Sequence, residues 1–145
     1  MINRGEQLAK LSQEHEASLV LAKALLEVAE RADEQELLAT IDKLKTYNDE
    51  ELELHFQHEE RTVFAPIFKE HREHIPFATA LLKDHGEMRR LIPNLHIGAA
   101  REQIHYFAEL LRKHTLQEEQ ELFPLIAEQF TDEQLAAIVD FTPIH

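Results

Sequence analysis

Residues 100–125 read AREQIHYFAELLRKHTLQEEQELFPL. Along this stretch, residues at steps of three and four share one helical face: Ala100, Ile104, Phe107, Leu111, His114, Glu118, Leu122 and Leu125. Apolar side chains at this spacing predict an amphipathic helix with one buried stripe. His114 and Glu118 interrupt the stripe, and they lie one turn apart on the same face. This helix therefore turns an imidazole and a carboxylate toward the core.

Three further segments carry the same kind of stripe, each with a polar interruption. These are His15 in about 6–31, His55 and Glu59 in about 34–69, and His85 in about 76–94. The fourth segment covers about 99–129. Helix formers dominate and only three glycines occur, so we predict an all-α fold, an up-down-up-down four-helix bundle.

Local signals place the ends of these helices. Asp33 is a candidate cap for the second helix, and Thr131 starts a short C-terminal helix over about 135–141. Proline lacks an amide proton. We therefore expect Pro66 to kink or end the second helix and Pro124 to interrupt the fourth.

Length and composition exclude several classes of protein. The 145 residues suit a single domain over 1–145, and the net charge of −13 disfavours nucleic acid and anionic membrane as partners. The chain has no cysteine, so disulfides, thiol nucleophiles and thiolate metal sites are excluded. No apolar run approaches the roughly 18 residues of a membrane span. Residues 1–10 show no signal peptide, so a cytoplasmic location is expected.

The chain contains an internal repeat. HFQHEE at 55–60 corresponds to HTLQEE at 114–119, and a proline follows each within seven residues. QEHE at 13–16 corresponds to KDHG at 83–86. Two helical hairpins, each with a lone His and then a His-x-x-x-Glu-Glu, predict a bundle with an approximate two-fold axis.

The polar interruptions form a candidate metal site: His15, His55, Glu59, His85, His114 and Glu118. A single His-x-x-x-Glu is more often an ion pair, and a lone His on an apolar stripe is more often a hydrogen-bonded core residue. Burying two carboxylates without compensation, however, costs several kcal/mol each. A pair of divalent cations would offset that cost, so the matched set favours metal binding.

With these residues the sequence resembles the hemerythrin-like, or HHE cation-binding, family over about residues 8–126. EEQELFP at 118–124 is similar to the family's second motif. The resemblance implies a four-helix bundle around a carboxylate-bridged di-iron centre, with two Fe ions and a bridging oxygen. It implies that the four histidines are terminal ligands and that Glu59 and Glu118 bridge the ions.

Two alternatives to that centre can be weighed from the donor set. Carboxylates and imidazoles without thiolates fit iron or manganese better than a closed structural zinc site, and manganese and zinc remain as substitutes. A ferritin-like bundle needs Glu-x-x-His on two helices. Only Glu102-x-x-His105 has that form, so the spacing disfavours this alternative.

One position departs from the oxygen-carrying hemerythrins, which have a second His four residues after the third-helix His. Here that residue is Arg89, which cannot coordinate a metal. Six ligands and a bridging oxygen then leave roughly two of about twelve positions open on two octahedral ions. We expect the centre to bind O2 or a related small ligand, for sensing, storage or delivery.

Two other functions stay open. The first is a di-iron enzyme acting on peroxide or nitric oxide, with Met88 or Arg89 lining its pocket and Arg89 binding the anion. The second is an iron-responsive interaction module. No catalytic residue is predicted.

Residues near the ligands are expected to play supporting roles. Glu60 and Glu119 should be solvated or orient imidazoles, and His58 should lie at the surface or support the ligands. The remaining histidines are expected at the surface or in loops: His71, His74, His96, His105 and His145.

Overall fold

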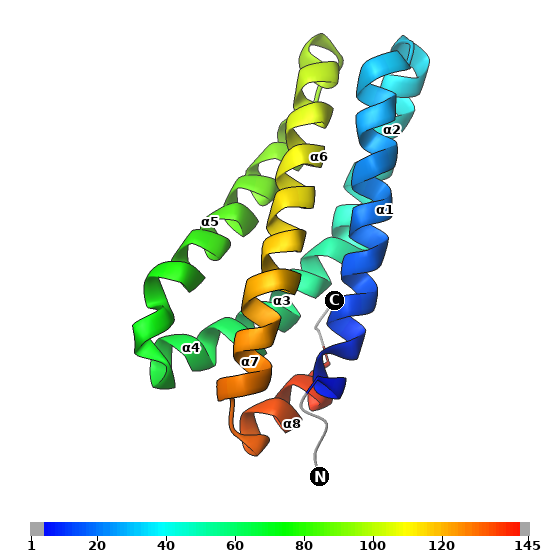
Figure 1. Cartoon of the computed structure of the whole chain (residues 1–145). Coiled ribbons are helices and arrows are strands. Elements are labelled where there is room, and N and C mark those ends of the chain that lie inside the picture. The colour runs from blue at the N-terminus through cyan, green and yellow to red at the C-terminus, as the bar shows by residue number, and fades with distance from the viewer. Residues whose placement is uncertain (1–4, 143–145) are drawn as a thin grey trace.

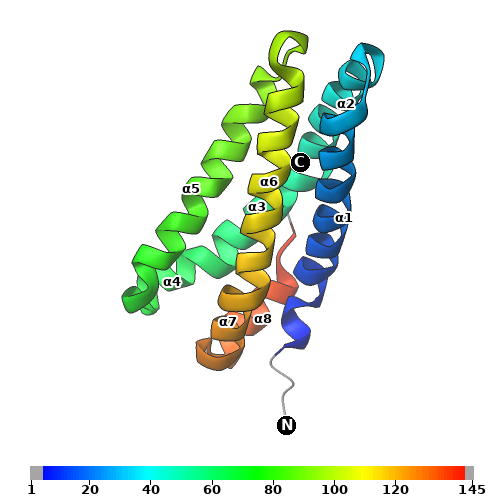
Figure 2. The same cartoon turned by 45° about the horizontal axis from the view of Figure 1, so that its top comes forward.

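The computed structural model describes residues 5–142, which are almost entirely helical. The bundle is built from α1 (Ala9–Arg31), α2 (Glu34–Tyr47), α5 (Ile75–Leu91) and α6 (Ala100–Gln117). Helices α3 (Glu53–Glu59) and α4 (Ala65–Glu70) continue α2, and α7 (Phe123–Gln129) continues α6. Successive long helices run in opposite directions (Figures 1 and 2), which confirms the predicted up-down-up-down bundle.

The short helix α8 (Asp132–Asp140) lies across the end of the bundle beneath α7 (Figure 1). Asp33 caps α2 through its side chain, as expected. Thr131 is the N-cap of α8 and forms a capping box with Gln134, so this helix begins at Asp132 and ends at Asp140 instead of covering the expected 135–141. Among residues 5–142, no helix combines the length and apolarity that a bilayer crossing demands. His145 and both ends of the expected 1–145 domain lie outside the described residues.

Within residues 5–142, π-helical turns interrupt the long helical runs at three places: η2 (Asn48–Leu52), η3 (Glu60–Phe64) and η7 (Glu118–Leu122). Such a turn contains one residue more than an α-helical turn and changes the phase of the helix that follows. After η7 the buried residue is therefore Ile126 rather than the expected Leu125, which is half-buried.

Both interrupting prolines lie shortly after such a turn. Pro66 is the second residue of α4, and Pro124 is the second residue of α7. A proline ring clashes with the carbonyl four residues earlier in an α-helix, and a wider turn before it relieves that clash. The expected kink and interruption therefore lie in the preceding π-helical turns, and the helices continue to Glu70 and Gln129.

The apolar core consists of two separate clusters of buried side chains. Ala22, Leu44, Phe56, Met88 and Leu111 belong to one, and Leu11, Val63, Leu81 and Leu122 belong to the other. On α1, His15 lies between Leu11 and Ala22, and on α5, His85 lies between Leu81 and Met88. A polar layer thus crosses the middle of the bundle, between the two clusters.

Candidate metal centre

The structure brings all six predicted ligands into this polar layer. None is more than 6% exposed: His15, His55, Glu59, His85, His114 and Glu118. One comes from α1, two from α3, one from α5, one from α6 and one from the first residue of η7. Four separate helical runs therefore contribute to one buried cluster.

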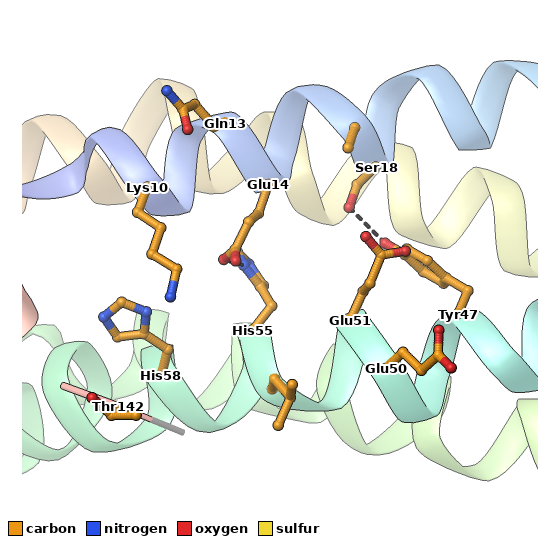
Figure 3. A pocket seen from close by; sticks show the side chains of 12 residues that line it. Lys10, Gln13, Glu14, Ser18, Tyr47, Glu50, Glu51, His55, His58 and Thr142 are labelled. Carbon is orange, nitrogen blue, oxygen red and sulfur yellow. Dashed lines mark hydrogen bonds and ion pairs between the residues drawn. The ribbon is translucent and has the colours of Figure 1, made fainter. Parts of the chain in front are cut away.

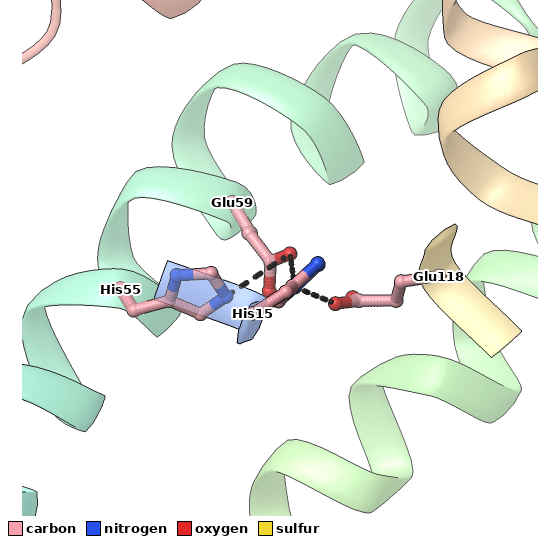
Figure 4. A group of neighbouring side chains, drawn as sticks. All are labelled: His15, His55, Glu59 and Glu118. Carbon is pink, nitrogen blue, oxygen red and sulfur yellow. Dashed lines mark ion pairs between the residues drawn. The ribbon is translucent and has the colours of Figure 1, made fainter. Parts of the chain in front are cut away.

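The cluster divides into two sets of candidate donor atoms. One set contains His15 and His55, and the other contains His85 and His114; Glu59 and Glu118 belong to both. Within each set, the donor atoms all lie within 4.8 Å of one another. Figure 4 shows the first set, with the carboxylates of Glu59 and Glu118 both directed toward the His15 ring and Glu59 also directed toward His55.

Each shared glutamate presents one oxygen to each set. In Glu59, Oε2 lies 3.3 Å from Nε2 of His55, and Oε1 lies 3.2 Å from Nε2 of His85. In Glu118, Oε1 lies 2.8 Å from Nε2 of His15, and Oε2 lies 3.2 Å from Nε2 of His114. A carboxylate that faces two separate ligand sets in this way can bridge two ions.

The carboxylates of the cluster find no hydrogen-bond partner within it, whereas Nε2 of His85 and Nε2 of His114 form a hydrogen bond at 3.2 Å. Both carboxylate oxygens of Glu59, both of Glu118 and Nε2 of His15 are buried without a hydrogen-bond partner. Imidazole nitrogens lie close to these oxygens, but the contacts lack hydrogen-bond geometry. Buried acceptors without partners are costly, and divalent cations would satisfy them. Nitrogen and carboxylate donors without sulfur suit iron or manganese, so the residues present fit a pair of such ions.

A family model, the hemerythrin HHE cation binding domain, matches residues 7–126. This chain belongs to that family. The match includes both helical hairpins and the whole polar layer, so the resemblance inferred from the sequence is confirmed and the chain carries a cation-binding domain. No curated protein and no solved structure gives a significant match.

Each imidazole of this hemerythrin domain contacts a further carboxylate through Nδ1. The pairs are His55 with Glu14 at 2.8 Å, His85 with Glu60 at 2.8 Å, His114 with Asp84 at 3.0 Å and His15 with Glu119 at 3.2 Å. At His55, His85 and His114 this contact is a hydrogen bond, which holds the proton at Nδ1 and fixes the ring orientation. The contact of Glu119 with Nδ1 of His15 lacks hydrogen-bond geometry. Nε2 is then the nitrogen that each ring presents to the centre.

These outer carboxylates follow the two-fold repeat. Glu14 and Asp84 each contact a histidine of their own hairpin, whereas Glu60 and Glu119 each contact a histidine of the other hairpin. The expectation that Glu60 orients an imidazole is confirmed by its hydrogen bond to His85, whereas Glu119 lies 3.2 Å from Nδ1 of His15 without forming a hydrogen bond. Sequence reasoning missed Glu14 and Asp84, although a signal was present, since both halves of the repeat have an acidic residue directly before the lone His.

The cluster holds protons on its imidazoles when no cation is present. Burial lowers the pKa of His15, but contact with Glu118 and neighbouring carboxylates outweighs burial and raises it to about 12. The same balance raises the pKa of His55 to about 9 and that of His114 to about 10. Burial raises the pKa of Glu59, but the surrounding imidazoles bring it well below its usual value. A bound cation must displace imidazole protons, so cation affinity should increase with pH.

Aromatic rings cover the histidines from the apolar clusters. The Phe56 ring stacks on His85 with centroids 3.9 Å apart, and Phe123 stacks on His15 with centroids 5.0 Å apart. Phe64 contacts His85 edge-on. These contacts restrict rotation of the His15 and His85 rings.

His58 belongs to neither ligand set. It is 2% exposed, and its Nε2 donates to the Ile138 carbonyl at 2.6 Å. Its ring stacks on Phe141. The expected surface position is therefore wrong, because His58 is turned inward and ties α3 to the C-terminal helix.

Arg89 has a different role from the anion-binding one considered above. Four hydrogen bonds at 2.7–3.1 Å join its guanidinium to Glu53 and Glu60. Burial raises the pKa of Glu60, but contacts with His85 and Arg89 bring it below the usual value. Arg89 thus holds Glu60 ionised in the position from which it orients His85.

We predict that Arg89→Met weakens cation binding about tenfold, because Glu60 loses the partner that holds it against His85. Competition with a chromophoric chelator would measure the change. Arg90→Met is the matched control, since Arg90 is exposed and pairs with Glu87 on its own helix. Equal affinity in the two variants would contradict the role assigned to Arg89.

Proposed function

We propose that this hemerythrin domain holds two iron ions and binds O2 or a related small ligand there. His15 and His55 would hold one ion, His85 and His114 the other, and Glu59 and Glu118 would bridge them. The observation that carries the proposal is the sharing of both glutamates, with one oxygen of each directed to each histidine pair.

The protein's own residues define what such a centre could do. When bound, the iron pair would supply open coordination positions and the capacity to change oxidation state. Hydrogen bonds from Nδ1 to carboxylates orient the imidazoles of His55, His85 and His114 before any small molecule arrives. The six residues are at most 6% exposed, which favours small, weakly polar ligands over large ones.

The test is metal analysis with an optical spectrum of protein produced under iron-replete conditions. We expect about two iron ions per chain and an absorption band in the near-ultraviolet or visible range that changes when air replaces argon. Colourless protein without iron would overturn the proposal. One ion per chain would overturn the paired centre.

The enzymatic alternative, action on peroxide or nitric oxide, loses its candidate anion-binding residue. The guanidinium of Arg89 is already held by Glu53 and Glu60, and Met88 is fully buried in an apolar cluster. Peroxide consumption by the iron-loaded protein at the rate of free iron would dismiss this alternative.

A further inference from the structure

A cavity of about 480 Å³ lies beside the candidate centre, between α1 and the segment formed by α2, η2 and α3. Figure 3 shows Lys10 and Glu14 directed from α1 toward the opposite helical run, and Glu51 directed from η2 toward α1; Glu50 also lines the cavity. The volume greatly exceeds that of a diatomic molecule. It therefore needs an explanation beyond the ligand proposed above.

The cavity ends on one of the candidate metal ligands. Glu14 and His55 both line it, and Oε1 of Glu14 lies 2.8 Å from Nδ1 of His55. On the far side of the same ring, Nε2 lies 3.3 Å from Glu59. The His55 ring therefore separates the cavity from the centre, and a passage between them requires the ring to release Glu14 and rotate.

The wall of the cavity carries an excess of negative charge. Three carboxylates line it, those of Glu14, Glu50 and Glu51, against the single ammonium group of Lys10. The whole chain is also acidic, at −13. A cleft lined mainly by one sign of charge concentrates ions of the opposite sign and raises their rate of arrival.

An unpartnered imidazole nitrogen is a second, independent sign of a ligand. His58 lines the cavity and is 2% exposed, and its Nδ1 is buried without a hydrogen-bond partner. Because Nε2 donates to the Ile138 carbonyl, Nδ1 presents a lone pair in the neutral ring. Imidazole nitrogen and carboxylate oxygen are the donors that transition-metal cations accept.

We propose that this cavity is the uptake route for divalent cations, which the carboxylates and the His58 imidazole along its wall attract one after another before the cations pass His55 into the centre. The proposal rests on the metal centre proposed above. The carboxylates attract the cation, and the ammonium group of Lys10 repels it. The passage past His55 limits the rate at which the centre is loaded.

The test is the rate at which metal-free protein takes up Co²⁺, followed by absorbance in a stopped-flow instrument at low ionic strength. The double variant Glu50→Gln/Glu51→Gln should load about three- to tenfold more slowly, and Lys10→Gln should load faster. High salt should remove most of both differences. The amount bound at saturation should stay the same, since none of these residues belongs to the two ligand sets.

Matched controls separate local from general charge effects. Glu27→Gln/Glu30→Gln makes the same change of charge on exposed positions of α1, about 20 Å along the helix from Glu14. A second pair of variants changes the volume of a side chain and leaves the charge unchanged. Ala17→Phe would fill the cavity and slow loading, whereas Ala24→Phe, exposed on the same helix outside the cavity, should not.

The experiment distinguishes an error in the uptake route from an error in the metal centre. If the cavity variants load at the rate of their controls, the uptake route is wrong while the centre stands. If the unaltered protein binds no Co²⁺ at any concentration tested, both the centre and the route are wrong.

Discussion

Protein carrying both His55→Gln and His114→Gln should take up no iron while still folding as a helical bundle. Each change removes one imidazole from a different ligand set, and a glutamine amide is a poor substitute for imidazole. Retained iron should fall from about two ions per chain to about none, because incomplete sites of this kind lose affinity by orders of magnitude. Metal analysis after dialysis against a weak chelator, with circular dichroism for folding, would measure the effect.

The matched control replaces two exposed histidines, His96→Gln and His105→Gln, with the same chemistry. This variant should hold iron like the unaltered protein. Single replacements of His55 or His114 should leave one ion more weakly held than the other. Full iron content in the double His55/His114 variant would show that the ligand assignment is wrong.

The bundle and the burial of the six polar residues could be predicted because both depend on periodicity along single helices. A stripe at three- and four-residue steps identifies each buried face, and a polar residue on that face must enter the core. His15 and His85 gave no local signal of pairing, but the repeat placed them at equivalent depths. The structure buries both beside the same two glutamates.

Features that depend on contacts between helices, or on departures from regular helical geometry, could not be predicted from the sequence. A π-helical turn changes helical phase without a distinct sequence code, so Leu125 was expected in the core in place of Ile126. The position of Arg89 depends on Glu53 and Glu60, which belong to another helical run. Its pairing with these two carboxylates could not follow from spacing on α5 alone.

The polar layer explains why metal should govern stability here. Two carboxylates with 0% exposure, Glu59 and Glu118, lie between two apolar clusters and accept no hydrogen bonds. In the metal-free protein only nearby imidazoles balance their charge. In the absence of cations, this layer then contributes least to the free energy of folding. Because all four helical runs meet there, its neutralisation should stabilise all four.

Iron loading should therefore raise the thermal midpoint of unfolding by about 10 °C for each ion bound. Each ion that binds to the native state alone adds about 4 kcal/mol at a free ion concentration about a thousand times the Kd. For a chain of this length, 1 kcal/mol corresponds to a shift of about 3 °C. Calorimetry of metal-free and loaded protein would measure the shift, which would also provide the physical basis of an iron-responsive interaction module.

The double variant Glu59→Gln/Glu118→Gln tests whether the bridging carboxylates cause this response. It keeps the size of both side chains but removes the charges that the cations neutralise, so its midpoint should not respond to iron. Glu27→Gln/Glu30→Gln, with the same charge change on the exposed face of α1, should keep the full shift. A midpoint that rises equally with iron in both variants would mean that the ions bind elsewhere, and the polar layer would then need another explanation for its two buried carboxylates.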